Sequence, residues 1–281
     1  MINEFVIYKK KVQNLSGGTV AEYAKNLHAF ARWIQNYRPG VTWSSVTKQD
    51  IEAHMMSMAD AGMKPRTIQL RVATIRSYYN YLRTQGMTSE NPAKYVQLPK
   101  AGEQIPQTVN VAAIVHYVTK PATTVETVTM QALISILVET GMRIQEAMDI
   151  RTGDINKQEQ SIIITGKGNK QRKVYYGDMT RKKMNALAQL VDTRRGFFHY
   201  TQWQLREMMT QELRGIVDYI HPHMLRHTFA TTMLEGGAQL KYVSAALGHE
   251  SVKTTERYTH VVNKAVETAV KTTAPRLEFK D

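Results

Sequence analysis

Arginine, histidine and tyrosine recur in a few short segments of this sequence, and these residue types can transfer a phosphoryl group. The segments read ETGMRIQEA at 139–147, HMLRHTFAT at 223–231, LGH at 247–249 and ERYTHV at 256–261. Breaking a phosphodiester without a metal ion requires a nucleophile, cations that hold the non-bridging oxygens, and an acid that protonates the leaving oxygen. A tyrosine hydroxyl can attack, a guanidinium bonds phosphate oxygens in pairs, and an imidazole can move protons near neutral pH.

The overall charge points to a polyanionic partner. Among 281 residues, 37 Lys and Arg outnumber 24 Asp and Glu, which gives a net charge of +13. The basic excess is divided almost equally between residues 1–98 and the remainder, which suits two lobes that grip one DNA duplex. The chain has no cysteine, so disulfides and thiolate chemistry are excluded, and a reducing cytosol is favoured. No stretch is apolar enough for a membrane helix, and residues 1–11 lack the order of a secretory signal.

Six positions in order give the chain a family resemblance. These are Arg143, Lys167, His223, Arg226, His249 and Tyr258. With the surrounding words TG-x-R, GKG, HxLRHTFAT, LGH and YTHV, they resemble the tyrosine recombinase (phage integrase) family, especially its simple, Xer-like two-domain members. The resemblance covers residues 109–261 and extends more weakly to the N-terminal region. Tyr258 is one of 14 tyrosines, and its place nine residues after His249 distinguishes it.

The resemblance implies a mechanism centred on a covalent DNA intermediate. Arg143 and Arg226 would clamp the scissile phosphate. Tyr258 would attack it, forming a 3′-phosphotyrosyl link and releasing a 5′-hydroxyl. Because the ester bond is exchanged and not lost, no ATP or other cofactor is expected.

The same resemblance implies the proton-transfer groups. Lys167, at the tip of a hairpin, would protonate the leaving oxygen, and Lys170 is the competing lysine, which we expect to contact the DNA backbone. His223 would be the acid/base partner of Tyr258, and His249 would donate a hydrogen bond to the phosphate. Glu146, three residues after Arg143, is expected to orient an arginine.

The implied activity is site-specific recombination: DNA integration, excision or resolution through a four-way Holliday junction. The expected partners are double-stranded DNA with a specific core site, further copies of the chain in a homo-tetramer on two DNA sites, and accessory DNA-bending or directionality proteins. The expected location is the cytoplasm, at the nucleoid, with no membrane partner. Three rival functions are a type IB topoisomerase, a DNA-binding protein without activity, and a metal-dependent nuclease.

Two other kinds of site are not expected. His221, His223 and His227 fall within seven residues, which invites a zinc site. Pro222 interrupts the segment and no cysteine assists, so we predict that no metal is bound. The GKG segment at 166–168 is too short for a nucleotide-binding loop, since the Walker pattern and its helix are absent.

The elements that must position these groups indicate a mainly α protein with a small β-sheet, of the α+β class. Pro99, Gly102 and Pro106 favour a linker at 99–107. We expect a helical core-binding domain at 1–98 and a mixed catalytic domain at 108–281. By resemblance, residues from about 262 onward form an oligomerisation tail, and its docking on a neighbour or on its own domain stays open.

Three helices are expected in residues 1–98. The first has Thr19 as N-cap with Glu22 as its capping-box partner, the second spans about 48–61 and ends at Gly62, and the third begins near Pro65. Met55, Met56 and Met58 are expected in the core. Arg66, Arg71 and Arg76 punctuate the third helix, either as a solvated basic face or as contacts to DNA phosphates.

In the C-terminal region we expect a hydrophobic helix over 125–139 that stops at Thr140-Gly141, and a second helix from Arg143. A β-branched strand at 162–165 and a return strand at 173–176 predict a hairpin with Lys167 at its tip. Helices dominate again from Thr180.

Overall fold

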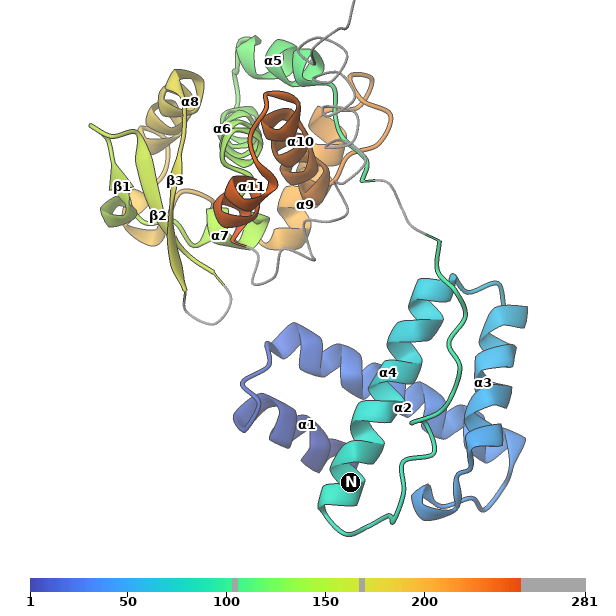
Figure 1. The fold of residues 1–281 in the computed structure, drawn as a ribbon. Helices are drawn as coiled ribbons and strands as arrows, with labels where there is room; N and C mark the ends of the chain where they lie inside the picture. The colour runs from blue at the N-terminus through green and yellow to red at the C-terminus, as the bar shows by residue number, and fades with distance from the viewer. Residues whose placement is uncertain (103–105, 167–169, 249–281) are drawn as a thin grey trace, which may run out of the picture. The chain divides into compact units, whose positions relative to one another are not determined.

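The structure is a computed structural model that describes residues 1–102, 106–166 and 170–248. The chain divides into two compact units, Met1–Glu103 and Gln104–Asp281, and the division falls inside the segment 99–107. The described residues are mostly helical with a small antiparallel sheet, which confirms the predicted fold class (Figure 1). Among these residues, no helix is long and apolar enough to cross a membrane.

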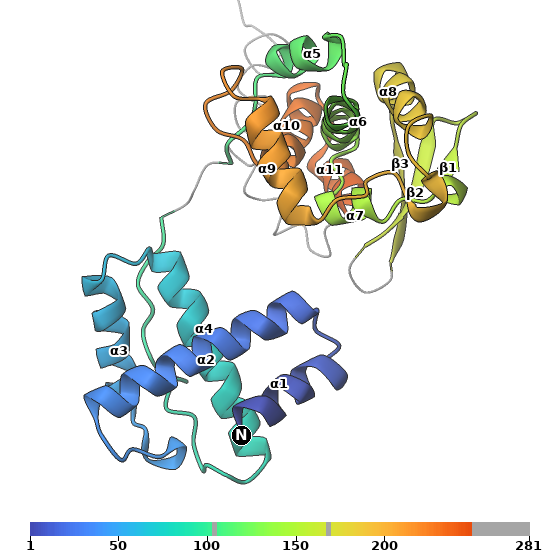
Figure 2. The ribbon, with the colours of Figure 1, turned by 180° about the vertical axis from the view of Figure 1, so that it is seen from behind.

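The first unit is a helical bundle around an aromatic core. Its helices are α1 (Ile2–Lys11), α2 (Gly17–Tyr37), α3 (Lys48–Asp60) and α4 (Pro65–Thr84). The long helix α2 contacts the other three (Figures 1 and 2). Phe5, Tyr78 and Tyr79 are fully buried, and the ring of Tyr78 meets Phe5 edge-on at 5.2 Å between centroids. Stacked and edge-on rings of this kind add to the free energy gained by burying their area.

Two expectations for this unit were wrong. Helix α2 is capped by Ser16, whose side chain accepts a hydrogen bond from the Thr19 backbone nitrogen, so the helix starts before Thr19. Met56 is 64% exposed, whereas Met58 is buried. On a helix of 3.6 residues per turn, positions 51, 55 and 58 share a face and position 56 turns away from it. The boundaries expected for α3 and the start expected for α4 were correct to within one or two residues.

The second unit contains the remaining elements. Its first part has α5 (Val111–Thr119), α6 (Val125–Thr140), α7 (Ile144–Met148), β1 (Ile155–Asn156), β2 (Ser161–Thr165) and β3 (Gln171–Tyr175). Its second part has α8 (Asp178–Ala188), α9 (Gln202–Glu212), α10 (Pro222–Glu235) and α11 (Leu240–Leu247), and short 3₁₀ turns lie at Thr152–Asp154 and Thr193–Arg195. A further 3₁₀ turn, Trp43–Ser45, belongs to the first unit.

Helix α6 is the centre of the second unit. Every residue from Val128 to Leu137 is buried, so the helix is covered on all sides. The sheet and α8 lie on one side of it, and α9 and α10 lie on the other, whereas α11 contacts both α10 and β3 (Figures 1 and 2). The helix ends at Gly141, as the sequence predicts, with φ of 62° in the left-handed region. This buried helix therefore fixes the position of the segment that follows it, which contains Arg143.

The strands form an antiparallel sheet in the order β1-β2-β3, and β2 and β3 form the predicted hairpin. Thr165 pairs with Gln171, and the Gly166 nitrogen donates to the Lys170 carbonyl at 2.8 Å. Ile162 and Ile164 face the core, and Ile163 is exposed. Residues 167–169, including Lys167, lie outside the described part of the chain.

Candidate active site

The structure brings three of the predicted site residues together. Arg143, His223 and Arg226 line one cavity, together with residues from the start of α7, from Gln202 at the start of α9 and from Pro222 at the start of α10. Lys167, His249 and Tyr258 lie outside the described residues, so their roles stay predictions. The cavity therefore contains two guanidinium groups and an imidazole from segments that are more than 70 residues apart in sequence.

Arg143 is positioned by the turn that joins α6 to α7. Gly141 allows this turn, because a Cβ atom there would lie only 2.9 Å from Cγ and Cε1 of the Phe229 ring. Arg143 is the N-cap of α7, and its backbone nitrogen donates to Glu146 Oε2 at 2.7 Å. Its side chain is 37% exposed and forms an ion pair with Glu146, with Nη1 2.9 Å from Oε1. The guanidinium is thus oriented by Glu146 and still reaches solvent.

Arg226 joins the ends of two helices. It is 5% exposed, and it donates from Nη1 to the Gly141 carbonyl and from Nη2 to the Leu247 carbonyl, each at 2.6 Å. Gly141 ends α6, and Leu247 is the last residue of α11. The last carbonyls of a helix lack partners within the helix and carry its negative dipole end, so a buried cation there is well placed. Arg226 therefore stabilises the fold at the same point where it lines the cavity.

The sequence did not indicate a role for Arg172 in this site. Arg172 lies on β3 and forms a two-bond ion pair with Glu146, at 2.9 Å to Oε1 and 2.7 Å to Oε2. Glu146 is thus bound by two arginines, in agreement with the expectation that it orients one. A signal did exist: Arg172 pairs across the hairpin with the inward-facing Ile164, and an arginine that faces a core needs an acidic partner.

The pKa of Glu146 follows from these contacts. Burial acts to raise the pKa of this carboxyl, and the hydrogen bonds from Arg172 and from the Arg143 backbone, with the charges of both arginines, outweigh it and lower the pKa below its usual value. Glu146 is therefore ionised at neutral pH and holds both arginines by charge-assisted bonds.

His223 is held in its neutral form. Loss of water around the imidazole lowers its pKa most, and the charge of Arg226 is the next cause, followed by His221, Arg206 and Arg143. A neutral imidazole at neutral pH can accept a proton from an attacking hydroxyl. The rings of His221 and His223 are 6.3 Å apart between centroids. Within the described residues, no group of three acidic or histidine side chains is arranged to hold a metal ion.

The predicted DNA contacts differ in their surroundings. Arg66 is exposed and bonds Gln69, and Lys170 is exposed on the hairpin. Arg71 is partly buried beside the Met58 sulfur. Arg76 donates from Nε to the Ala93 carbonyl at 2.9 Å, which fastens the segment after α4 to the helix. Of the four cations, Arg66 and Lys170 thus have the side chains most open to a ligand.

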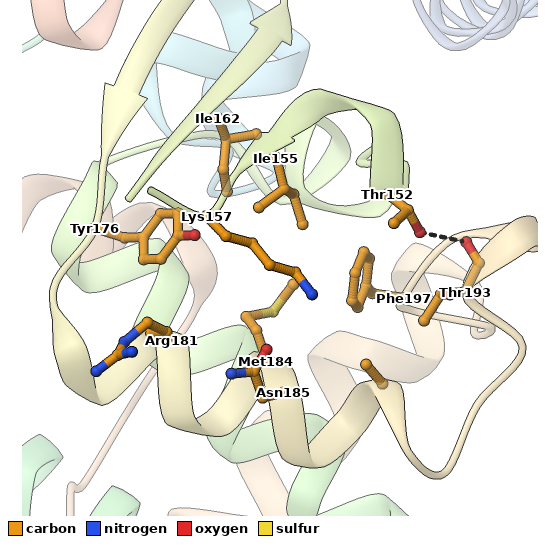
Figure 3. A pocket seen from close by; sticks show the side chains of 11 residues that line it. Thr152, Ile155, Lys157, Ile162, Tyr176, Arg181, Met184, Asn185, Thr193 and Phe197 are labelled. Carbon is orange, nitrogen blue, oxygen red and sulfur yellow. Dashed lines mark hydrogen bonds between the residues drawn. The ribbon is translucent and has the colours of Figure 1, made fainter. Parts of the chain in front are cut away.

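A second cavity of the same unit lies between the sheet, α8 and the turn at Thr193–Arg195 (Figure 3). Ile162, Met184 and Phe197 supply its apolar lining, and Lys157 extends across it. It contains none of the predicted site residues.

Two family models match the sequence. Residues 107–265 match the model of the phage integrase family, and residues 2–86 match that of the phage integrase N-terminal SAM-like domain. Tyrosine recombinase XerC of Herpetosiphon aurantiacus is 30% identical over 93% of this chain and 90% of its own length. Tyrosine recombinase XerD of Oceanobacillus iheyensis is 27% identical over 98% of each chain.

Solved structures share the fold. XerH site-specific recombinase, bound to palindromic difH substrate in a post-cleavage complex, has a TM-score of 0.73 at 20% identity and covers 97% of this chain and 84% of its own. The Tn1549 transposon integrase in complex with a circular intermediate DNA has a TM-score of 0.71 at 14% identity, covering 95% of this chain and 99% of its own.

Proposed function

Because this chain belongs to the phage integrase family, we propose that it is a site-specific DNA recombinase that cuts and rejoins strands by the tyrosine recombinase mechanism. The observation that carries the proposal is the cavity shared by Arg143, His223 and Arg226. It supplies two phosphate-binding guanidinium groups and a neutral imidazole. The family match, residues 107–265, also includes Lys167, His249 and Tyr258.

The proposed reaction exchanges one phosphodiester for another. The Tyr258 oxygen attacks the scissile phosphorus, its proton passes to His223, and the bond from phosphorus to the 5′-oxygen breaks. Lys167 gives a proton to that leaving oxygen, while His249 donates a hydrogen bond to the phosphate. A 5′-hydroxyl of the partner strand then attacks the 3′-phosphotyrosyl bond and releases Tyr258. Four such exchanges, in pairs through a four-way junction, recombine two duplexes.

The arginines supply most of the electrostatic stabilisation in this proposal. Negative charge builds up on the non-bridging oxygens as the nucleophile and leaving group share the phosphorus. A fixed donor at that position is worth about 3–4 kcal/mol of the barrier. Arg226 is fixed by two backbone carbonyls and Arg143 by Glu146, so neither guanidinium has to be ordered when DNA arrives.

The partners of the proposal are duplex DNA with a specific core site and further copies of the chain. The net charge of +13 supports binding to phosphates. We propose a tetramer on two DNA sites, joined through residues of the C-terminal tail, with accessory DNA-bending or directionality proteins as further partners. Val262 and Val266, which lie outside the described residues, test the tail: changing both to Asp abolishes DNA-bound assembly if the tail docks on a neighbour. Normal assembly of this variant excludes docking in trans.

The experiment that tests the function is covalent trapping. A duplex is first selected from a random-sequence pool by its retention on the Tyr258→Phe protein. A copy nicked beside the cleavage point loses a short fragment when cut, so the intermediate cannot be rejoined. We expect the unaltered protein to form, in the presence of EDTA, an adduct that survives denaturant. The Tyr258→Phe protein should bind the duplex without forming the adduct. An adduct with Tyr258→Phe, or a strict need for divalent metal, contradicts the proposal.

The choice between Lys167 and Lys170 can be made with a substrate whose 5′-bridging oxygen is sulfur. A thiolate is a good leaving group without a proton, so loss of the general acid is rescued by the sulfur substrate and loss of a binding contact is not. We expect rescue of Lys167→Ala and none of Lys170→Ala. Rescue of Lys170→Ala alone reverses the assignment.

A type IB topoisomerase would form a different product from the same covalent intermediate. It relaxes supercoiled plasmid that carries one copy of the selected duplex, without exchanging strands. We expect a plasmid with two copies to be resolved into two circles or to have the segment between them inverted. Relaxation without any recombinant product favours the topoisomerase.

A further inference from the structure

We propose that Arg172 is a positioning residue of this active site, which neutralises Glu146 so that the charge of Arg143 is directed at the bound phosphate. The inference rests on the proposed function, because it concerns how the phosphate clamp of that reaction is assembled. Arg172 has no role in the proposed reaction steps, and its side chain is only 12% exposed and makes three hydrogen bonds.

The contacts of Arg172 connect two distant parts of the catalytic unit. Its Nη1 and Nη2 bind the two oxygens of Glu146, and its Nε donates to the Ala246 carbonyl at 3.0 Å. Ala246 directly precedes Leu247, whose carbonyl accepts from Arg226. The end of α11 is therefore held by two arginines on consecutive carbonyls. Gly248 leaves room for this arrangement, since a Cβ atom there would lie 2.9 Å from Arg172 Nη1.

The charges around Glu146 show why a second arginine is needed. Glu146 is 5% exposed on its side chain, and its carboxylate is shared between Arg143 and Arg172. With both arginines present, the group of three carries a net charge of +1. Arg143 is the more exposed of the two arginines and lines the cavity, so the unbalanced positive charge faces that cavity.

Without Arg172, the same carboxylate has Arg143 as its only cation in this group. A buried carboxylate binds its single partner tightly, because the alternative is a buried charge without compensation. Arg143 then forms a neutral pair with Glu146, and a phosphate gains less from approaching it. The loss appears in the chemical step, where charge builds up on the phosphate, more than in binding of the intact duplex, which uses many other contacts.

The test is a double-mutant cycle on the rate of adduct formation with the nicked duplex. We expect Arg172→Gln to slow this rate by about 10- to 100-fold, the range found when a residue that orients a metal ligand is removed. The affinity for intact duplex, measured in the Tyr258→Phe background, should change by less than about threefold, because the lost interaction belongs to the reacting state. Melting temperatures of all variants establish that they are folded.

The decisive comparison repeats Arg172→Gln in a Glu146→Gln background. Glutamine can still accept the bond from the Arg143 nitrogen, as in other capping boxes, but it has no charge to neutralise. We expect Arg172→Gln to cost much less there, so that the two changes are not additive. An equal loss of rate in both backgrounds overturns the inference, since Arg172 would then act independently of Glu146.

The matched control is Lys173→Gln. Lys173 is the next residue of β3, exposed on the other face, and pairs with Glu159 at 2.9 Å. Lys173→Gln removes one positive charge from the same strand and should leave the rate of adduct formation unchanged. If it slows that rate as much as Arg172→Gln does, the effect comes from net charge alone and the inference is overturned. If Arg172→Gln does not fold, Arg172→Met replaces it in the cycle, because methionine also removes the charge and fills much of the space of the arginine stem. Absence of any adduct with the unaltered protein overturns the proposed function itself.

Discussion

Replacing Gly141 by alanine tests whether the turn that carries Arg143 is shaped by close packing. Its φ of 62° costs a residue with a Cβ atom about 1–2 kcal/mol. The added Cβ would also overlap the Phe229 ring, and overpacking of this kind costs about 1–3 kcal/mol. We expect a loss of about 2–5 kcal/mol in the free energy of unfolding of the catalytic unit. Adduct formation should slow as well, because the Gly141 carbonyl positions Arg226.

The measurement is urea unfolding followed by circular dichroism, and Gly237→Ala is the matched control. Gly237 has φ of 86° in the same unit, but a Cβ atom there meets nothing within 4 Å, so only the backbone cost of about 1–2 kcal/mol should appear. Adding Phe229→Ala to Gly141→Ala removes the overlap and should make the two changes non-additive by at least about 1 kcal/mol. If Gly141→Ala costs no more than Gly237→Ala, the reasoning from close packing is refuted.

Three further predictions concern pH and salt. Because the pKa of His223 is lowered, the second-order rate constant of adduct formation, which reports the free enzyme, should fall only below pH 6.5 as His223 becomes protonated. A fall that depends on His223 and has its midpoint at or above pH 6.5 contradicts the neutral imidazole. In the first unit, burial and then the charge of Arg71 lower the pKa of His54 to about 4. The unfolded chain therefore binds a proton at His54 more tightly than the folded chain does. The free energy of unfolding should fall by about 3 kcal/mol as the pH falls from 6.5 through 4. His54→Phe should remove that dependence in acid unfolding curves, and an unchanged curve for the variant counts against it. Finally, affinity for the selected duplex should fall steeply in a titration with salt, because phosphate contacts release counterions, and a flat response would exclude a phosphate clamp.

Much of the fold could be predicted because local signals and tertiary structure agree. Gly141 ends α6 in the left-handed conformation, Pro65 begins α4, and the β-branched run at 162–165 pairs with its return strand. The elements that sequence reasoning missed are α1, α5 and β1. β1 has only two residues, too few for any periodicity, and its place depends on pairing with β2. Met56 was assigned to the core by residue type, whereas the register of α3 places it in solvent.

The candidate site shows a similar division. Arg143, His223 and Arg226 could be predicted from the order of residues in the motifs, and the structure places them on one cavity. Arg172 could not be found in that way, because its role depends on which face of β3 points inward and on the nearness of α7 and α11. Arg76 shows the converse: its spacing on α4 fitted either a solvated basic face or a DNA contact, and its guanidinium bonds the Ala93 carbonyl of its own unit.

The bonds from Arg226 to the ends of α6 and α11 have a genetic consequence. A Tyr258→Phe allele should produce normal amounts of folded protein that still occupies DNA, so in a cell with both alleles it should interfere with the active copies. An Arg226 allele loses two buried bonds that tie helices together, and a loss of a few kcal/mol is enough to send a protein to the proteases. Such an allele should be scarce in the cell and recessive, although we propose that both residues serve the same reaction.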